Sequence, residues 1–562
     1  MTATLQGRLA AQWAADPERR RLGFVDRRGR IEGWDAPALR EQAGARARWM
    51  HLAGLGAGQV AVVVTADPKF AAVCVLAALE LGAVPLLVAP PAIQGVNSNL
   101  GRVLGHVVGL AEARLVLLPP AMAADGEALS SRGVCVLFGD APADVPRVAL
   151  PAVDPDPDRI ALLQLTSGTT GLPRICTWHH RQVLAAIDGM AEGMALGPDD
   201  RFVNWTPLYH DMGLINNFLL CLVRGLDLVL MDPFHFVGNP ALWLRTLHAV
   251  GATQTWSPNF GYALAAQRVT DASLEGVRLD GMRGFWNAGE KVHHATFVAF
   301  HERFAGHGLR WSALKANFGC AENVGGATFT APDGELVVER VRAETLREDG
   351  VAEVVDASFD GRAETVVSTG RGHPRLEVRI LGDDGSRLGD GRVGRIALAS
   401  PSRMVGFLGE PERSGEVLGE DHVLTGDLGY LRAGELFWVG RDREQINLSG
   451  VKFDPSDFED ALNAVEGVRK GCFAAFGVED ERLGSQRLVV LCEVQDGVEV
   501  DPAGVCTAIR AGIAGGLGVS VFEVHLTPKG QLTKTSSGKR RHLHFRDAFL
   551  RGAVEIVYSD RA

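Results

Sequence analysis

The feature that most constrains the fold is an alternation of short apolar runs with stretches of helical periodicity. The runs lie at 59–64, which is rich in β-branched residues, at 82–87 and at 114–118, and the helical stretches lie at 70–81 and 99–110. Strands that alternate with helices form βαβ units, which build mostly parallel sheets. We therefore predict an α/β fold that binds its ligands at the carboxyl ends of the strands.

Chain length and a change of composition predict more than one domain. A chain of 562 residues exceeds what a single hydrophobic core supports. The charged stretch 441–444 interrupts the apolar rhythm, and a smaller α+β unit follows it. We predict a large N-terminal domain of several subdomains over residues 1–440, a boundary at 441–443 and a small C-terminal domain over 444–562.

Charge and hydropathy exclude several classes of protein. The formal net charge of -11 disfavours binding to nucleic acid or to an anionic membrane. No apolar stretch reaches membrane-spanning length without polar interruption, and the first sixteen residues lack the pattern of a signal peptide. The eight cysteines form no CxxC pair, which favours reduced thiols. We therefore expect a cytoplasmic protein without a membrane span.

The stretch 165–174, Leu-Thr-Ser-Gly-Thr-Thr-Gly-Leu-Pro-Arg, has the composition of a phosphate-binding loop. Its glycines permit a tight turn, its hydroxyls add hydrogen-bond donors, and Arg174 adds a fixed positive charge. A hydroxyl-rich surface turn is the alternative, whereas a P-loop needs Lys after the second glycine, where this chain has Leu172. The candidate phosphate-binding residues are Thr166, Ser167, Gly168, Thr169, Thr170 and Gly171.

Four later stretches end predicted strands in aromatic, amide and carboxylate residues. They lie at 206–213, 255–260, 284–290 and 316–323. Successive strand ends of this kind predict a site built at one edge of a sheet, although the glycines fit ordinary turns and the aromatics fit a core equally well. The candidate substrate-pocket residues are Trp205, His210, Met212, Trp256, Phe260 and Trp286.

A basic turn near the C-terminus, Lys-Thr-Ser-Ser-Gly-Lys-Arg-Arg-His at 534–542, presents Lys539. A solvated basic tail is the alternative reading of this stretch.

Together these motifs resemble the adenylate-forming superfamily of acyl-CoA synthetases, nonribosomal peptide adenylation domains and luciferases. The resemblance covers nearly the whole chain and rests on five motifs in the family's order. They are the phosphate loop at 166–174, the Tyr-Gly-x-Thr-Glu-like stretch at 318–322, the ribose motif at 425–427, the hinge entry at 440–441 and the lysine loop at 535–539.

Within that superfamily the chain is most similar to the fatty acyl-AMP ligases. It shares their Pro-Leu-Tyr-His-Asp-Met-Gly-Leu-Ile stretch at 207–215 and their Ser-Pro-Asn-Phe stretch at 257–260. A long segment, 325–366, precedes a Val-Ser-x-Gly-Arg element at 367–371 and resembles their insertion. Such ligases deliver the acyl group to the phosphopantetheine arm of a carrier protein in place of free CoA.

The chain also departs from the ligases at four places. Arg174 replaces the usual Lys of the phosphate loop, and Phe318 replaces the usual Tyr. The stretch 287–290 reads Asn-Ala-Gly-Glu where the ligases have Asn-Gly-Ala-Glu, and 323–326 is unlike their usual continuation, which alters the expected acyl tunnel.

The resemblance implies that the chain uses ATP and Mg²⁺ to convert a fatty or aryl acid into an acyl adenylate with release of pyrophosphate. It implies that the phosphate loop with Arg174 holds the β- and γ-phosphates, that Lys539 bridges the α-phosphate and the acid, and that His210 lies where the acyl pocket meets the carboxylate. It assigns Glu322 and Thr169 to Mg²⁺, Asp427 and Arg441 to the ribose, and Asn287, Ala288, Gly289, Asn317, Phe318 and Gly319 to adenine.

A mobile C-terminal domain is a further implication, with residues 441–443 as hinge and Arg443 at the turning position. The expected acceptor of the acyl group is the thiol of an acyl or peptidyl carrier protein. A CoA ligase, a ligase with a non-thiol acceptor, and a nucleotide-binding protein without catalysis are the alternatives.

Overall fold

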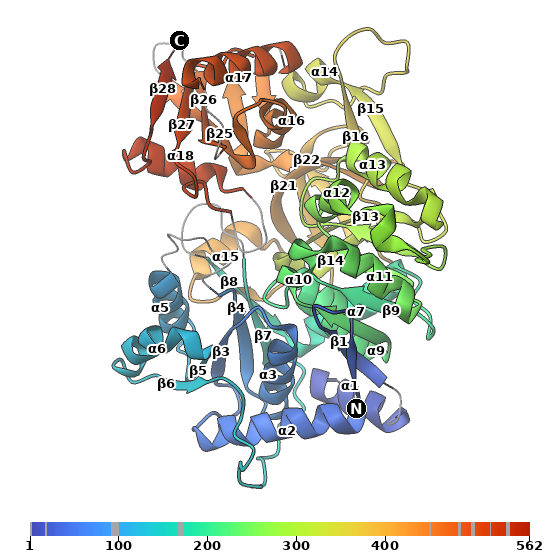
Figure 1. The fold of residues 1–562 in the computed structure, drawn as a ribbon, viewed down its shortest axis with the longest axis vertical. Coiled ribbons are helices and arrows are strands. Elements are labelled where there is room, and N and C mark those ends of the chain that lie inside the picture. The colour runs from blue at the N-terminus through green and yellow to red at the C-terminus, as the bar shows by residue number, and fades with distance from the viewer. Residues whose placement is uncertain are drawn as a thin grey trace.

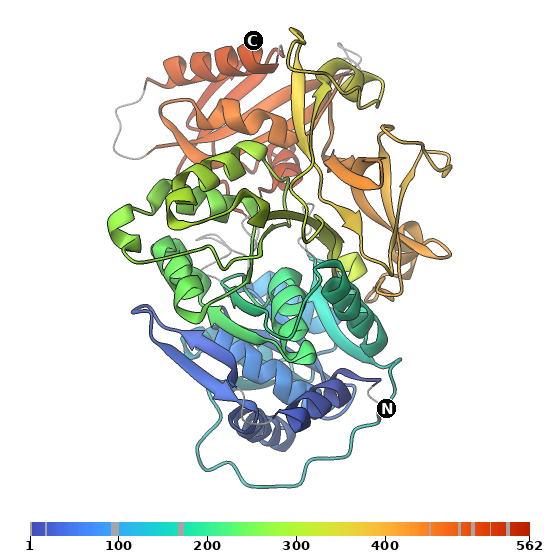
Figure 2. The ribbon, with the colours of Figure 1, turned by 90° about the vertical axis from the view of Figure 1, so that its right-hand side faces the viewer.

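The computed structural model describes most of the chain. The described residues are 3–16, 20–90, 100–166, 173–448, 451–480, 485–495, 501–517, 519–534 and 540–561. They form an elongated molecule with the N-terminus toward one end and the C-terminal helices and strands at the other (Figure 1). A view turned by 90° shows the same order along the long axis (Figure 2).

One sheet has seven strands in the order β20-β8-β7-β4-β3-β5-β6. Both of its faces are covered, because Ala61 and Val63 pack with helix α3 while Val62 and Val64 pack with helix α5, so the strand reads as one continuous apolar run. The elements are β3 (Val60–Val64), β4 (Val84–Val88), β5 (Leu115–Leu118), β6 (Cys135–Phe138), β7 (Ile160–Leu165), β8 (Ile175–His179), β20 (Gly406–Phe407), α2 (Ala36–Leu52), α3 (Pro68–Glu80), α5 (Leu100–Leu110) and α6 (Ala123–Ser130).

The second sheet has nine strands in the order β17-β14-β13-β12-β11-β9-β10-β1-β2. Four neighbouring strands, β13, β12, β11 and β9, pair in parallel, so the polar stretches that follow them meet at one edge. The strands are β1 (Arg20–Val25), β2 (Ile31–Asp35), β9 (Arg201–Asn204), β10 (Asp227–Met231), β11 (Gln254–Ser257), β12 (Gly284–Asn287), β13 (Leu314–Cys320), β14 (Gly325–Phe329) and β17 (Arg371–Gly372). The predicted α/β class with large, mostly parallel sheets is confirmed.

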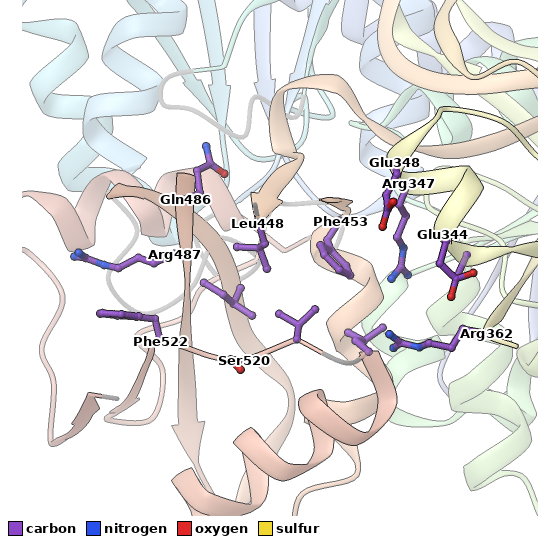
Figure 3. Close-up of a pocket in the computed structure, with 14 residues that line it drawn as sticks. Glu344, Arg347, Glu348, Arg362, Leu448, Phe453, Gln486, Arg487, Ser520 and Phe522 are labelled. Carbon is purple, nitrogen blue, oxygen red and sulfur yellow. The ribbon is translucent and has the colours of Figure 1, made fainter. Parts of the chain in front are cut away.

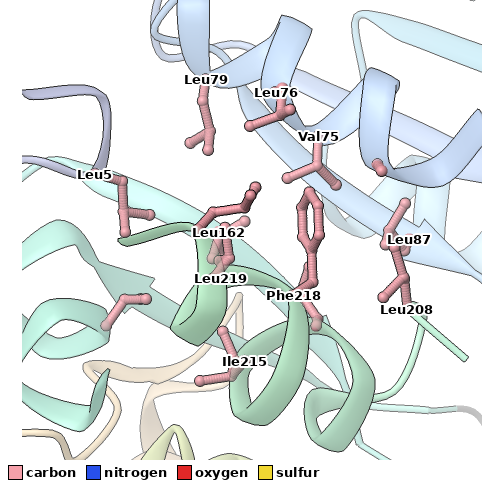
Figure 4. Close-up of a cluster of buried hydrophobic side chains, with 14 of the residues drawn as sticks. Leu5, Val75, Leu76, Leu79, Leu87, Leu162, Leu208, Ile215, Phe218 and Leu219 are labelled. Carbon is pink, nitrogen blue, oxygen red and sulfur yellow. The ribbon is translucent and has the colours of Figure 1, made fainter. Parts of the chain in front are cut away.

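Helices cover both faces of this second sheet. On one face, Trp243, Tyr262 and Phe300 form a core with strand residues, and on the other face α7 and the π-helix η2 form the largest core of the molecule. Figure 4 shows that core, where Phe218 and Leu219 of η2 face Val75 and Leu76 of α3. The helices are α1 (Leu5–Ala15), α7 (His180–Gly193), α8 (Asp211–Gly213), η2 (Leu214–Leu219), α9 (Leu220–Arg224), α10 (Pro233–Gly238), α11 (Pro240–Val250), α12 (Asn259–Arg268) and α13 (His294–Phe304).

Smaller sheets follow the second large sheet. A four-stranded antiparallel sheet, β18-β19-β21-β22, carries the ribose motif, and a β15-β16 hairpin with helix α14 lies within the segment that resembles the ligases' insertion. The elements are β15 (Val338–Arg342), α14 (Ala343–Glu348), β16 (Ala363–Val367), β18 (Glu377–Leu381), β19 (Gly394–Ala399), α15 (Pro411–Val417), β21 (His422–Arg432) and β22 (Glu435–Arg441).

The last part of the chain has its own sheet, β25-β26-β27-β28, and its own apolar core, which includes Phe458, Val490 and Ile509. Its elements are β23 (Ile446–Leu448), β24 (Val451–Phe453), α16 (Glu459–Asn463), β25 (Val468–Asp480), β26 (Ser485–Val494), α17 (Pro502–Leu517), β27 (Glu523–Thr527), α18 (His542–Leu550) and β28 (Tyr558–Arg561). The exact domain boundaries and the mobility of this part stay predictions. None of the described helices is long and apolar enough to cross a membrane.

A buried cation fixes the turn that leads out of β14. Lys315 is 1% exposed, and its Nζ donates to the carbonyl oxygens of Ala331, Pro332 and Gly334 at 2.8, 2.8 and 2.6 Å. Burial lowers the pKa of Lys315 to about 8, although the nearby Asp333 carboxylate raises it. The ammonium thus satisfies three carbonyl groups at once.

Replacing this cation tests its contribution to stability. We expect Lys315→Met to lower the free energy of unfolding by about 3 kcal/mol, because three carbonyl groups lose a charged donor that is itself buried. Lys69→Met removes a surface ion pair with Glu32 and is the matched control, with an expected loss of about 1 kcal/mol or less. Urea unfolding measures both, and equal losses would contradict the assigned role of Lys315.

Candidate active site

The two ends of the predicted phosphate loop are held together. The backbone N–H of Thr166, after β7, donates to the carbonyl oxygen of Arg174, before β8, at 2.9 Å. The guanidinium of Arg174 lies 5.0 Å from the ring centroid of Phe407 in β20. The candidates Ser167, Gly168, Thr169, Thr170 and Gly171 lie outside the described residues. The sheet thus fixes the base of the loop and its positive charge.

Two carboxylates and two guanidinium groups lie close together beside this loop. Glu322 follows β13, and burial raises the pKa of its carboxyl, as does the nearby Asp211, whereas Arg441 and Arg174 lower it. Elements far apart in the sequence therefore place alternating charges at the shared edge of the second sheet. Buried carboxylates stay ionised when positive charges lie close to them, as the two guanidinium groups do here.

This arrangement fits the proposed Mg²⁺ ligand. Carboxylate oxygen is the ligand that Mg²⁺ prefers, and Glu322 lies near a second carboxylate, that of Asp211. Substrate phosphates commonly complete such a site, so few protein ligands are needed. Within the described ranges no group of three His, Cys, Asp or Glu residues is arranged to hold a metal ion, and Thr169, the second predicted ligand, lies outside them.

The predicted ribose residues face each other across two strands. Asp427 of β21 pairs in register with Arg441 of β22, and the Arg441 Nε lies 3.5 Å from the Asp427 Oδ1. Burial alone would lower the pKa of Arg441, but the carboxylates of Asp427, Glu444 and Glu322 raise it. A carboxylate held by a fixed cation can accept hydrogen bonds from two adjacent hydroxyls.

The predicted adenine residues lie on neighbouring strand ends. Phe318 is 5% exposed, and its ring centroid lies 6.3 Å from that of Trp438. Asn287 donates from Nδ2 to Asn259 Oδ1 at 3.0 Å, whereas its buried Oδ1 has no hydrogen-bond partner among the described residues. Such an orphaned acceptor suits the amino group of a base. Asn317, next to Phe318, points to the opposite face of β13.

His210 and Met212, two of the predicted substrate-pocket residues, lie beside Asp211 and Gly289 respectively. His210 Nδ1 lies 2.7 Å from the Asp211 Oδ1 and 3.2 Å from the backbone nitrogen of Met212, so both contacts use Nδ1 and leave Nε2 for a ligand. Gly289 has φ +85°, and a Cβ there would come within 3.0 Å of the Met212 Cε. Any larger residue at 289 would therefore be strained and would crowd Met212.

The predicted substrate-pocket aromatics lie on two faces of the sheet. Trp205 stacks on Phe236, with centroids 3.8 Å apart, and meets Phe260 edge-on at 5.6 Å. Trp256 and Trp286 belong to the core on the opposite face, together with Met212. A single acid pocket does not touch all of them.

Charged residues of the C-terminal part lie near Glu290, at the sheet edge where the polar strand ends meet. We call this edge the strand-edge site. The ion pair of Arg540 with Glu459 lies close to Glu290, and Lys534 lies near both carboxylates. Burial is the main cause that lowers the pKa of Lys534. Lys539 lies outside the described residues, between Lys534 and Arg540, and so does the side chain of Arg443.

A second ionic contact was not predicted from the sequence. Lys291 Nζ lies 3.5 Å from the Asp457 Oδ1, and Arg347 of α14 lies 3.6 Å from the Asp457 Oδ2 and also pairs with Glu364. These four residues, the joint cluster, connect the N-terminal part, the α14 hairpin and the C-terminal part. Hydrophobic periodicity describes local structure, so it cannot predict ion pairs between residues so far apart in the sequence.

A pocket of about 410 Å³ lies beside the joint cluster, between α14 and the last sheet (Figure 3). Arg347 and Arg362 reach toward it from one side, and Leu448, Phe453 and Phe522 line the other. Charged contacts therefore accompany this pocket, with the Arg347 guanidinium 4.5 Å from the ring centroid of Phe453 and 3.6 Å from Asp457.

Titration of Glu459 predicts a pH dependence of stability. Burial raises the pKa of this carboxyl from 4.5 to about 7, with Arg540 opposing and Glu290 adding to the shift. Because the folded chain binds this proton more tightly than the unfolded chain, stability falls as the pH rises through that window. We expect Glu459→Gln to reduce the decline of the thermal midpoint between about pH 5 and pH 7. Parallel curves for variant and wild type would contradict this assignment.

Comparison with known proteins gives one family and several relatives. The family model described as AMP-binding enzyme matches residues 10–408. A putative acyl-CoA synthetase of Caulobacter vibrioides is 31% identical over 531 residues, which cover 93% of this chain and 91% of the relative. A medium-chain-fatty-acid–[acyl-carrier-protein] ligase of Moorena producens is 30% identical over 72% of this chain and 70% of its own.

Solved structures share the fold. A structure from a study of fatty acyl-adenylate ligases of E. coli and L. pneumophila superposes with a TM-score of 0.88 at 24% identity and covers 98% of both chains.

Proposed function

Because the chain belongs to the AMP-binding enzyme family, we propose that it activates a fatty or aryl acid as its adenylate and transfers the acyl group to the phosphopantetheine thiol of a carrier protein. The chain is an AMP-forming ligase, and the adenylate-forming resemblance of its motifs is confirmed. One observation carries the site proposal: Arg174, Asp211, Glu322 and Arg441 converge at the edge where four parallel strands end.

In the first half-reaction the negatively charged carboxylate of the acid must approach the negatively charged phosphates of ATP. The acid's carboxylate oxygen attacks the α-phosphorus of ATP in line, and the bond to pyrophosphate breaks. Arg174 offsets charge on the β- and γ-phosphates, and Glu322 would hold Mg²⁺, which would supply further positive charge there. Asp427 and Arg441 orient the ribose, while Phe318 and Asn287 hold the adenine.

Lys539 is the proposed group between the α-phosphate and the acid. Lys534 and Arg540, which flank the segment that contains it, lie near Glu290 at the end of the strand-edge stretch 284–290. A lysine five residues beyond Lys534 is then within reach of the site. His210 is the proposed partner of the acid's carboxylate on the opposite side, in a form that carries a proton on Nε2 and donates from it.

The acceptor thiol separates two candidate functions. The relative from Moorena producens is named as a ligase that acts on acyl carrier protein, which supports the carrier thiol. The relative from Caulobacter vibrioides is named a putative acyl-CoA synthetase, which favours CoA as the second candidate.

Acid-dependent exchange of labelled pyrophosphate into ATP tests adenylation. We expect exchange with Mg²⁺ and at least one acid of a mixed fatty and aryl panel. Purified adenylate offered to CoA and to a phosphopantetheinylated carrier in parallel then identifies the acceptor. No exchange with any acid would contradict the proposed function, and consumption by CoA alone would replace the carrier by CoA.

Lysine substitution tests the assignment of Lys539. We expect Lys539→Ala to reduce pyrophosphate exchange by about a hundredfold or more while ATP still binds, because the lost charge acts mainly in the transition state. Lys470→Ala changes an exposed lysine of the same part of the chain and is the matched control. Loss of ATP binding together with exchange would show that Lys539 is structural.

A further inference from the structure

Three aromatic rings fill the space beneath the acid end of the strand-edge site. Trp256 of β11 and Trp286 of β12 stack with centroids 5.6 Å apart, and Phe329 of β14 meets them edge-on at 6.4 and 5.5 Å. The three residues are 0%, 1% and 3% exposed. We call them the aromatic plug.

The plug lies where a long acyl tail would run. Met212 lies beside Gly289, because a Cβ on Gly289 would be 3.0 Å from the Met212 Cε, and we infer that the tail of an acid held by His210 runs along Met212. Met212, Trp256, Trp286 and Phe329 all belong to the core on the face covered by η2 and α7. A tail that continues along this face runs into the plug.

The space behind the plug is closed as well. A Cβ placed on Gly326 of β14 would lie 2.9 Å from Phe329, 3.2 Å from Asn317 and 3.3 Å from the sulfur of Met190. Only a glycine fits among these side chains. Since a side chain with almost no accessible surface borders no channel as wide as a water molecule, the plug leaves no path for an alkyl chain.

Hydrogen bonds hold the plug in place. Trp286 donates from Nε1 to Gln254 Oε1 at 2.8 Å, and Gln254 donates from Nε2 to Asp200 Oδ1 at 3.2 Å. Arg283 pairs with the same carboxylate at 2.7 Å. Swinging Trp286 aside to admit a tail would leave Gln254 buried without its donor, which costs free energy.

We propose that Trp256 and Trp286 restrict this enzyme to compact acids, such as a short alkanoate or a single-ring aryl acid, and exclude long-chain fatty acids. This inference rests on the proposed adenylation and narrows its substrate class. Two relations support it: the almost complete burial of the stacked indoles and the hydrogen-bonded chain from Trp286 to Asp200.

Pyrophosphate exchange with acetate, butyrate, octanoate, palmitate and benzoate tests the wild-type protein directly. We expect the kcat/KM for the best compact acid to exceed that for palmitate by about a hundredfold or more, since each methylene that does not fit carries a penalty. Palmitate as good as the compact acids would overturn the inference but not the adenylation. Exchange with no acid at all would overturn adenylation itself.

Variants test which residues set the limit. We expect Trp286→Leu or Trp256→Leu to raise the kcat/KM for octanoate relative to butyrate by about tenfold or more. Trp256→Leu removes no hydrogen bond between described residues, so it still tests the inference if Trp286→Leu fails to fold. Thermal midpoints report folding in each case.

Trp243→Leu is the matched control, because Trp243 is buried on the opposite face of the sheet and donates from Nε1 to Thr255 Oγ1 at 2.9 Å. We expect it to destabilise the fold without changing the order of preferred acids. A folded plug variant with the wild-type length profile would overturn the inference. The inference would also be overturned if Trp243→Leu extended the range of accepted acids as much as the plug variants do, or if Phe260→Ala alone extended it. Other residues would then set the limit on chain length.

Discussion

The opposition of buried charges at the edge of the second large sheet is the interaction on which the site depends. The carboxylate of Asp211 raises the pKa of Glu322. The guanidinium groups of Arg174 and Arg441, which come from two other sheets, lower it. Because the first sheet carries the phosphate loop and the antiparallel sheet carries the ribose motif, the charges are correctly placed only when all three sheets pack together. The packing that forms the fold therefore also assembles the site.

A second set of charges makes the connection to the C-terminal part. The joint cluster of Lys291, Arg347, Glu364 and Asp457 lies beside a pocket of about 410 Å³. Ion pairs form and break with smaller net changes in free energy than a dry apolar core. A contact of this kind suits the proposed movement of the C-terminal part.

The sequence predicts local features well and distant contacts poorly. The helix predicted at 70–81 and the strand runs predicted at 59–64 and 82–87 follow from periodicity, and the meeting of four strand ends follows from parallel pairing. The joint cluster could not be found this way, because its partners are far apart in the chain. The aromatic strand ends also look alike in sequence, yet Trp205 and Trp286 point to opposite faces of the sheet.

Titration with a non-hydrolysable acyl-sulfamoyl adenosine tests most directly whether these strand ends form one adenylate site. The account predicts binding of one molecule per chain by calorimetry, strongly weakened in Asp427→Ala, which removes the carboxylate assigned to the ribose. A compact acyl group serves as the probe. Absence of binding, or binding that Asp427→Ala leaves unchanged in a folded protein, would contradict the site.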